Sequence, residues 1–88
     1  MKRLEARFKG RVQGVGFRAT VREIAGSSAV AGWVRNEADG SVYVVAEGDE
    51  SEVNRFLELI QERMGRYIQS VGRVDGVPVG ELGFEVRR

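Results

Sequence analysis

The feature that most constrains the fold is a change of hydrophobic period across a glycine-rich stretch near the N-terminus. From Lys2 to Gly10, apolar residues alternate with charged ones, which is the pattern of a strand with one face on a core. From Phe17 to Ala25, apolar residues recur at helical spacing. The chain therefore starts as a strand that turns through a tight loop into a helix.

A hairpin is predicted after this first helix. Val34 and residues 42–45 are apolar segments on either side of Asp39-Gly40, a dipeptide that favours a turn between paired strands. We expect two antiparallel strands here. The pattern leaves open which of Trp33 and Val34 faces the core.

A second helix and two more strands are predicted in the C-terminal half. Asp49 and Glu52 have the spacing of a capping box, and the helix behind them should end near Gly65. Its apolar stripe consists of Val53, Phe56, Leu57, Ile60 and Met64. Residues 67–75 form a weak strand pattern, and alternation between residues 82 and 86 predicts a final strand.

The first six of these elements have the order βαββαβ, which predicts an α+β sandwich with an antiparallel sheet and two helices on one face. In the split βαβ arrangement the first two strands of the chain run parallel, and the third lies antiparallel between them. Parallel strands end at the same edge of a sheet. The loop after the first strand should therefore lie close to Asn36, at the end of the second strand.

The glycine-rich loop has the composition of an anion-binding cradle. Glycines allow successive N–H groups to point at one place, and Arg18 adds a charged fork at a helix start, where the dipole favours an anion. The P-loop is excluded because it ends in Gly-Lys-Ser/Thr, whereas Arg18 is followed here by Ala19 and Thr20. The dinucleotide-binding fingerprint is excluded because it requires a glycine at the position of Ala19. The residues expected to bind phosphate are Gln13, Gly14, Val15, Gly16, Phe17 and Arg18.

Five segments resemble one known family, and together they cover nearly the entire chain. They are GRVQGVGFR (10–18), GWVRN (32–36), DGSV (39–42), VVAEG (44–48) and GFEVR (83–87). In this order and spacing the set resembles the acylphosphatases. The resemblance implies a small ferredoxin-like sandwich that hydrolyses carboxyl-phosphate anhydrides. It also implies that Arg18 binds the phosphate group and that Asn36 orients the attacking water.

Composition limits the chemistry of such a site. The chain has no cysteine and no histidine, which removes disulfides, thiolate nucleophiles and the commonest general base. Asn36 cannot act as a base either, but its amide can orient a water molecule. With no acid to protonate a leaving group, the site suits an acyl phosphate, whose carboxylate departs unaided. Glu37 and Asp39 are candidate Mg²⁺ ligands, although such carboxylates are more often solvated.

Charge is unevenly distributed along the chain. Residues 1–36 hold eight Lys/Arg against two acidic residues, and residues 37–88 hold six against eleven. The positive part contains the loop, so its field should concentrate a small anionic substrate there. No apolar run has the length of a signal peptide core or a membrane span.

We therefore expect a single domain over residues 1–88 that acts as a cytoplasmic monomer without metal or cofactor. Its expected partner is a small-molecule acyl phosphate, with inorganic phosphate as product and inhibitor and with no nucleic-acid or membrane partner. Two alternatives stay open. One is a module that binds acyl or carbamoyl phosphate without fast turnover, and the other is an RNA-binding ferredoxin-like domain that stacks bases on Trp33 and Tyr43.

The end of the first helix departs from the family pattern. The family usually has Leu-Gly where this chain has Ser28-Ala29. If Ala29 adopts the left-handed conformation of that glycine, it carries a strain on the order of 1 kcal/mol. Replacing Ala29 by glycine should then raise the melting temperature.

Overall fold

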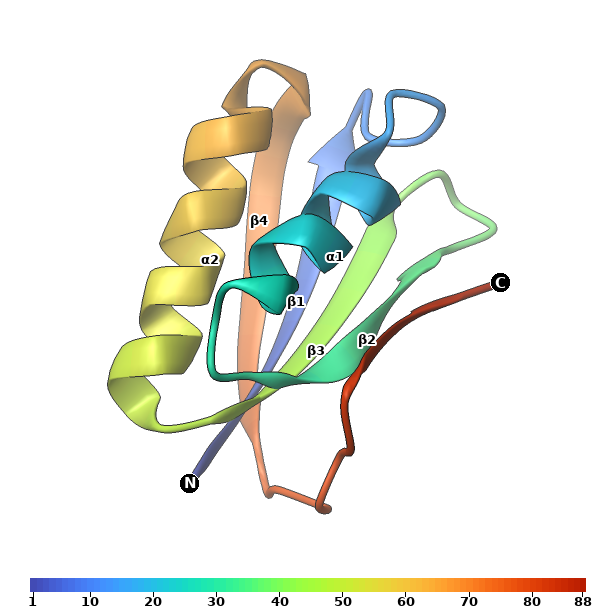
Figure 1. Ribbon diagram of the computed structural model, residues 1–88. Helices are drawn as coiled ribbons and strands as arrows, with labels where there is room; N and C mark the ends of the chain where they lie inside the picture. Colours follow the sequence, from blue (N-terminus) through green and yellow to red (C-terminus); the bar gives the residue numbers. More distant parts are fainter.

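The computed structural model describes residues 1–88 and contains five strands, two helices and one short 3₁₀ segment (Figure 1). In chain order these are β1 (Lys2–Gly10), α1 (Phe17–Gly26), β2 (Ala31–Asn36), β3 (Val42–Gly48), α2 (Glu50–Met64), η1 (Gly65–Tyr67), β4 (Ile68–Gly76) and β5 (Phe84–Arg87). Neither helix is both long enough and apolar enough to cross a bilayer.

The strands form one sheet in the order β4-β1-β3-β2-β5, and both helices cover the same face of it (Figure 1). The expected βαββαβ sandwich is confirmed, including the insertion of β3 antiparallel between β1 and β2. The sheet is mixed rather than purely antiparallel, because β5 pairs with β2 in parallel. After β4, at one edge of the sheet, the chain crosses to the opposite edge and forms β5 beside β2. β5 runs in the same direction as β2 and opposite to β4.

The core lies between the sheet and the two helices. Seventeen buried residues form one apolar cluster, in which the rings of Phe8 and Phe17 lie 5.2 Å apart. Val34 belongs to this cluster, and Trp33 does not. Because neighbouring residues of a strand face opposite sides of the sheet, this places Trp33 on the face without helices.

Arginines cover the aromatic rings on that open face. The guanidinium carbons of Arg35 and Arg87 lie 4.9 and 4.6 Å from the Trp33 ring centroid, and Arg7 lies 5.0 Å from that of Tyr43. Trp33 is consequently only 8% exposed. Side chains of the protein itself thus occupy the ring faces on which nucleic-acid bases would stack.

The end of α1 differs from the expectation. No residue other than glycine has a positive φ, so the strain expected at Ala29 is absent. The hydroxyl groups of Ser27 and Ser28 instead donate to the carbonyl of Ile24, at 3.2 and 2.8 Å. These bonds satisfy a terminal carbonyl of the helix without a left-handed residue. Ala29→Gly has no strain to relieve and should not raise the melting temperature.

The capping box expected at the start of α2 is also wrong. Asp49 is the N-cap residue, but its side chain makes no capping hydrogen bond. The Glu52 carboxylate accepts the backbone N–H of Ala29 at 3.1 Å instead. A tertiary contact between the end of α1 and the first turn of α2 therefore replaces the local motif.

A buried carboxylate holds the connection between β4 and β5. Glu47, at the end of β3, is 3% exposed and accepts the N–H groups of Val79, Gly80 and Glu81 at 2.8, 3.0 and 3.0 Å. It also pairs with the guanidinium of Arg3 at 2.7 Å. These four donors fix the segment that leads into β5.

The same contacts set the ionisation of Glu47. Burial alone would raise its pKa, but the N–H donors, led by Val79 and Glu81, together with Arg3 lower the pKa to about 2. Since the folded-state pKa lies below the ordinary value of 4.5, this carboxylate stabilises the fold above that value. Its contribution is lost as the pH falls from about 4.5 toward 2.

Glu47→Gln should lower the free energy of unfolding by about 3 kcal/mol, because an amide N–H₂ then faces the buried donors. Urea unfolding at pH 7 measures this loss, and unfolding between pH 5 and 2 should show a smaller acid dependence in the variant. Glu58→Gln is the matched control, since Glu58 is exposed and pairs with Arg55 at 3.6 Å. Equal losses in the two variants would contradict a special role of Glu47.

Candidate active site

The loop between β1 and α1 presents unpaired backbone N–H groups. Gly14 and Gly16 both have φ of 78°, a left-handed conformation that glycine adopts without strain. No backbone hydrogen bond is donated from Gln13 to Gly16. Phe17 and Arg18 start α1, where the first N–H groups have no partner within the helix. The loop thus offers several N–H donors next to a helix N-terminus, which is an anion-binding arrangement.

Apolar side chains anchor the loop at both ends. Val12 is fully buried before the glycines, and Phe17 is 2% exposed after them. Both belong to the main core cluster. Because the core holds the two ends, the N–H groups between them keep a fixed direction.

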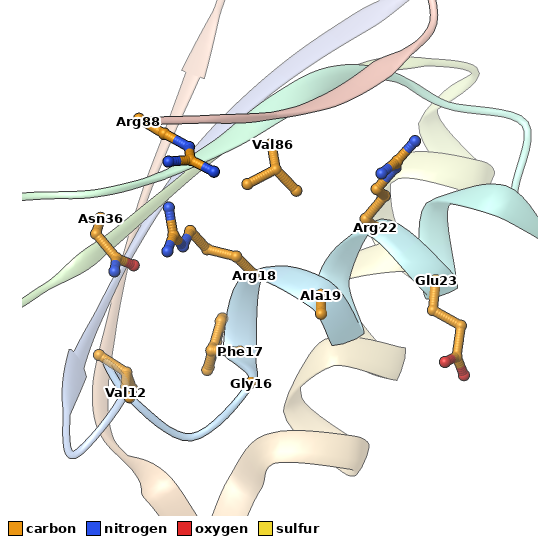
Figure 2. A pocket seen from close by; sticks show the side chains of 11 residues that line it. Val12, Gly16, Phe17, Arg18, Ala19, Arg22, Glu23, Asn36, Val86 and Arg88 are labelled. Carbon is orange, nitrogen blue, oxygen red and sulfur yellow. The ribbon is translucent and has the colours of Figure 1, made fainter.

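Arg18 projects from the first turn of α1 into an open pocket of about 690 Å³ (Figure 2). The pocket is lined by Val12, Gly14, Gly16, Phe17, Arg18, Ala19, Arg22, Glu23, Asn36, Val86 and Arg88. Arg18 donates to the carbonyl of Arg87 at 3.4 Å and pairs with no carboxylate. Its remaining donors are available to an anionic ligand.

Asn36 reaches the same pocket from the end of β2. Figure 2 shows its amide group directed toward the guanidinium of Arg18. The two residues are far apart in the sequence, and the sheet order brings them together because β1 and β2 run parallel on either side of β3.

Gln13 and Val15 do not line the pocket with their side chains. Val15 packs against the core. The Gln13 side-chain amide donates to the carbonyls of Glu37 and Ser41, at 2.8 and 2.9 Å. Both acceptors belong to the turn that follows Asn36. Gln13 therefore ties the cradle loop to the hairpin that carries Asn36.

The two carboxylates of this hairpin have partners within it. Asp39 accepts the hydroxyl and the backbone N–H of Ser41, and these bonds lower the pKa of Asp39, the hydroxyl most strongly. Glu37 pairs with Arg35 at 2.9 Å. No group of three or more Asp, Glu, His or Cys residues is arranged to hold a metal ion.

Six residues of the pocket wall were not among the predicted site residues: Val12, Ala19, Arg22, Glu23, Val86 and Arg88. Arg22 follows Arg18 by four residues, so helical spacing alone places it on the same face. Val86 and Arg88 reach the pocket because β5 pairs with β2, and no local pattern indicates that pairing.

The fold and the site together define a small α+β sandwich with unpaired backbone N–H groups at its first strand-to-helix loop. The acylphosphatase family model matches residues 4–83. An acylphosphatase of Salinibacter ruber is 51% identical over 99% of this chain and 94% of its own length. An acylphosphatase of Thermotoga maritima is 41% identical over 99% of this chain and 98% of its own length. This chain belongs to the acylphosphatase family.

Solved structures agree with this assignment. The crystal structure of acylphosphatase from Bacillus subtilis superposes with a TM-score of 0.91 and 30% identity, over 100% of both chains. Acylphosphatases are hydrolases that act on small-molecule acyl phosphates, and the family and the fold support that activity here.

Gln13→Ala should lower kcat for an acyl phosphate about tenfold with a smaller change in KM, because the cradle stays intact but loses its alignment with Asn36. Gln13→Glu should be at least as impaired, since a carboxylate cannot donate to the carbonyls of Glu37 and Ser41. Gln61→Ala, on the exposed side of α2, is the control. Steady-state kinetics with melting curves give the result, and a wild-type kcat for Gln13→Ala would show that the tie is dispensable.

Proposed function

We propose that this protein hydrolyses acyl phosphates to a carboxylate and inorganic phosphate by direct attack of water on phosphorus. The observation that carries the proposal is the meeting of three elements in one pocket: the unpaired N–H groups of the loop, Arg18 and Asn36. Phosphoryl transfer depends mostly on positioning and on stabilising charge. These elements supply both.

The phosphate group is bound by the cradle in this proposal. Arg18 contacts two phosphate oxygens with its planar fork, and the N–H groups from Gln13 to Arg18 bind the third. The charge of the helix N-terminus adds to this attraction. Product phosphate has the same oxygens, so it should compete with the substrate.

Asn36 orients the attacking water. Its amide oxygen accepts a hydrogen bond from the water, which directs the water oxygen at phosphorus. As the new P–O bond forms, the bond between phosphorus and the acyl oxygen breaks, and the carboxylate leaves with the electron pair. The proton of the water passes to a phosphate oxygen.

The pocket favours a leaving group that needs no proton. Glu23 is the carboxylate that lines it, and Glu23 pairs with Arg63 at 3.0 Å. A carboxylate leaves without protonation, whereas the alkoxide of an ordinary phosphate ester does not. Acyl phosphates should therefore be much better substrates than alkyl phosphates.

Hydrolysis of benzoyl phosphate in excess EDTA tests the proposal. The expected result is turnover that is independent of added Mg²⁺ and competitively inhibited by inorganic phosphate, with little activity on alkyl phosphates. Activity that disappears in EDTA and returns with Mg²⁺ would contradict the metal-independent mechanism. Stoichiometric binding without turnover would identify a binding module instead.

Replacing Arg18 and replacing Asn36 should change the kinetic constants in different ways. Arg18→Ala should raise KM and the inhibition constant of phosphate and also lower kcat, because the guanidinium binds the phosphate oxygens along the whole reaction. Asn36→Ala should lower kcat by roughly 10²-fold with nearly unchanged KM, because Asn36 contacts only the attacking water.

Two variants serve as controls for this comparison. Arg18→Lys keeps the charge but loses the bidentate fork, so it should restore only part of the phosphate affinity. Asn54→Ala, on α2, should retain wild-type kinetics. If Asn36→Ala keeps its turnover, or loses phosphate binding together with turnover, the water-orienting role is wrong.

A further inference from the structure

The pocket carries more positive charge than the proposed phosphate site uses. Arg18, Arg22 and Arg88 line it, and none of them lies within ion-pair distance of a carboxylate. The acidic residue of the wall, Glu23, is paired with Arg63 outside this set. Arg22 and Arg88 therefore line the pocket with no carboxylate in ion-pair contact.

Arg22 is held on the same face of α1 as Arg18, one turn further along. Side chains four residues apart in a helix are neighbours, and like charges at this spacing destabilise the helix. Figure 2 shows the Arg18 side chain directed toward Asn36 and the Arg22 side chain directed away from it, with the side chain of Val86 between them. An anionic group of a ligand beside Arg22 would compensate the charge of its guanidinium.

The reaction geometry directs the acyl group toward Arg22. In an in-line displacement, the attacking water and the leaving group lie on opposite sides of phosphorus. In Figure 2, Asn36 lies on one side of Arg18, and Ala19 and Arg22 lie on the other. If Asn36 orients the water, as proposed above, the acyl group leaves past the small side chain of Ala19 toward Arg22.

We propose that Arg22 selects acyl phosphates whose acyl group bears a second negative charge. An example is a dicarboxylic acid with one carboxyl group joined to phosphate and the other free. The inference rests on the proposed function and names its substrate class. Guanidinium groups bind carboxylates through charge-assisted hydrogen bonds, and Val86, 36% exposed, offers an apolar contact to the carbon skeleton between the two charges. Arg22 is assigned this role before Arg88, because α1 holds its backbone, whereas Arg88 follows the last residue of β5.

Benzoyl phosphate and 4-carboxybenzoyl phosphate provide the test, since they share the reacting centre and the ring and differ by one carboxylate. We expect the wild-type protein to prefer the carboxylated substrate in kcat/KM by about fivefold, the scale of one ion pair at a protein surface. Arg22→Gln should bring this ratio close to one, mainly through a higher KM for 4-carboxybenzoyl phosphate. The wild-type preference should also shrink as salt is added.

Arg55→Gln is the matched control, because it removes the same charge from an exposed position on α2. It should keep the wild-type ratio. An equal fall of the ratio in both variants would show that the preference comes from the field of the whole molecule, which overturns the assignment to Arg22.

The remaining outcomes separate this inference from the proposed function. If benzoyl phosphate is hydrolysed but the carboxylate brings no advantage, or the advantage survives Arg22→Gln, the role of Arg22 is wrong and the proposed hydrolysis stands. If neither substrate is hydrolysed, both the proposed function and the role of Arg22 are wrong.

Discussion

The site depends on a loop that is fixed by apolar contacts while its N–H groups remain unpaired. Val12 and Phe17 are buried in the core on either side, and Gly14 and Gly16 take the left-handed conformation between them. Buried N–H groups without partners are rare in folded proteins, but this loop lies at an open pocket where water or a ligand can pair with them. The core thus fixes the two ends of the loop, and the N–H groups of the loop keep no partner within the chain.

Sheet topology supplies the rest of the site. The insertion of β3 between β1 and β2 brings Asn36 to the edge where the cradle lies, and Gln13 ties the two together. The parallel pairing of β5 with β2 adds a third side, including the Arg87 carbonyl that receives a hydrogen bond from Arg18. Glu47 holds the connection into β5 at the opposite end of β3, so a carboxylate distant from the pocket helps to position one of its walls.

Much of this architecture can be predicted from the sequence, because burying one face of a strand or helix leaves a periodic pattern. The order of the elements and the placement of Asn36 near the loop follow from such patterns. Trp33 and Val34 are both apolar, so only the register of the hairpin decides which one is in the core. The expected capping role of Glu52 fails for a related reason, since the Glu52 carboxylate binds the Ala29 N–H through a tertiary contact. Local spacing cannot reveal a partner that folding brings from elsewhere in the chain.

A crystal structure with inorganic phosphate tests the central claim most directly. We expect a phosphate ion bound by the N–H groups between Gln13 and Arg18 and by the Arg18 guanidinium, with the amide of Asn36 next to it on the side from which we propose that water attacks. Because the cradle is held by the core, its backbone should move little on binding. A phosphate ion bound elsewhere, with this loop empty at saturating phosphate, would contradict the assignment of the site.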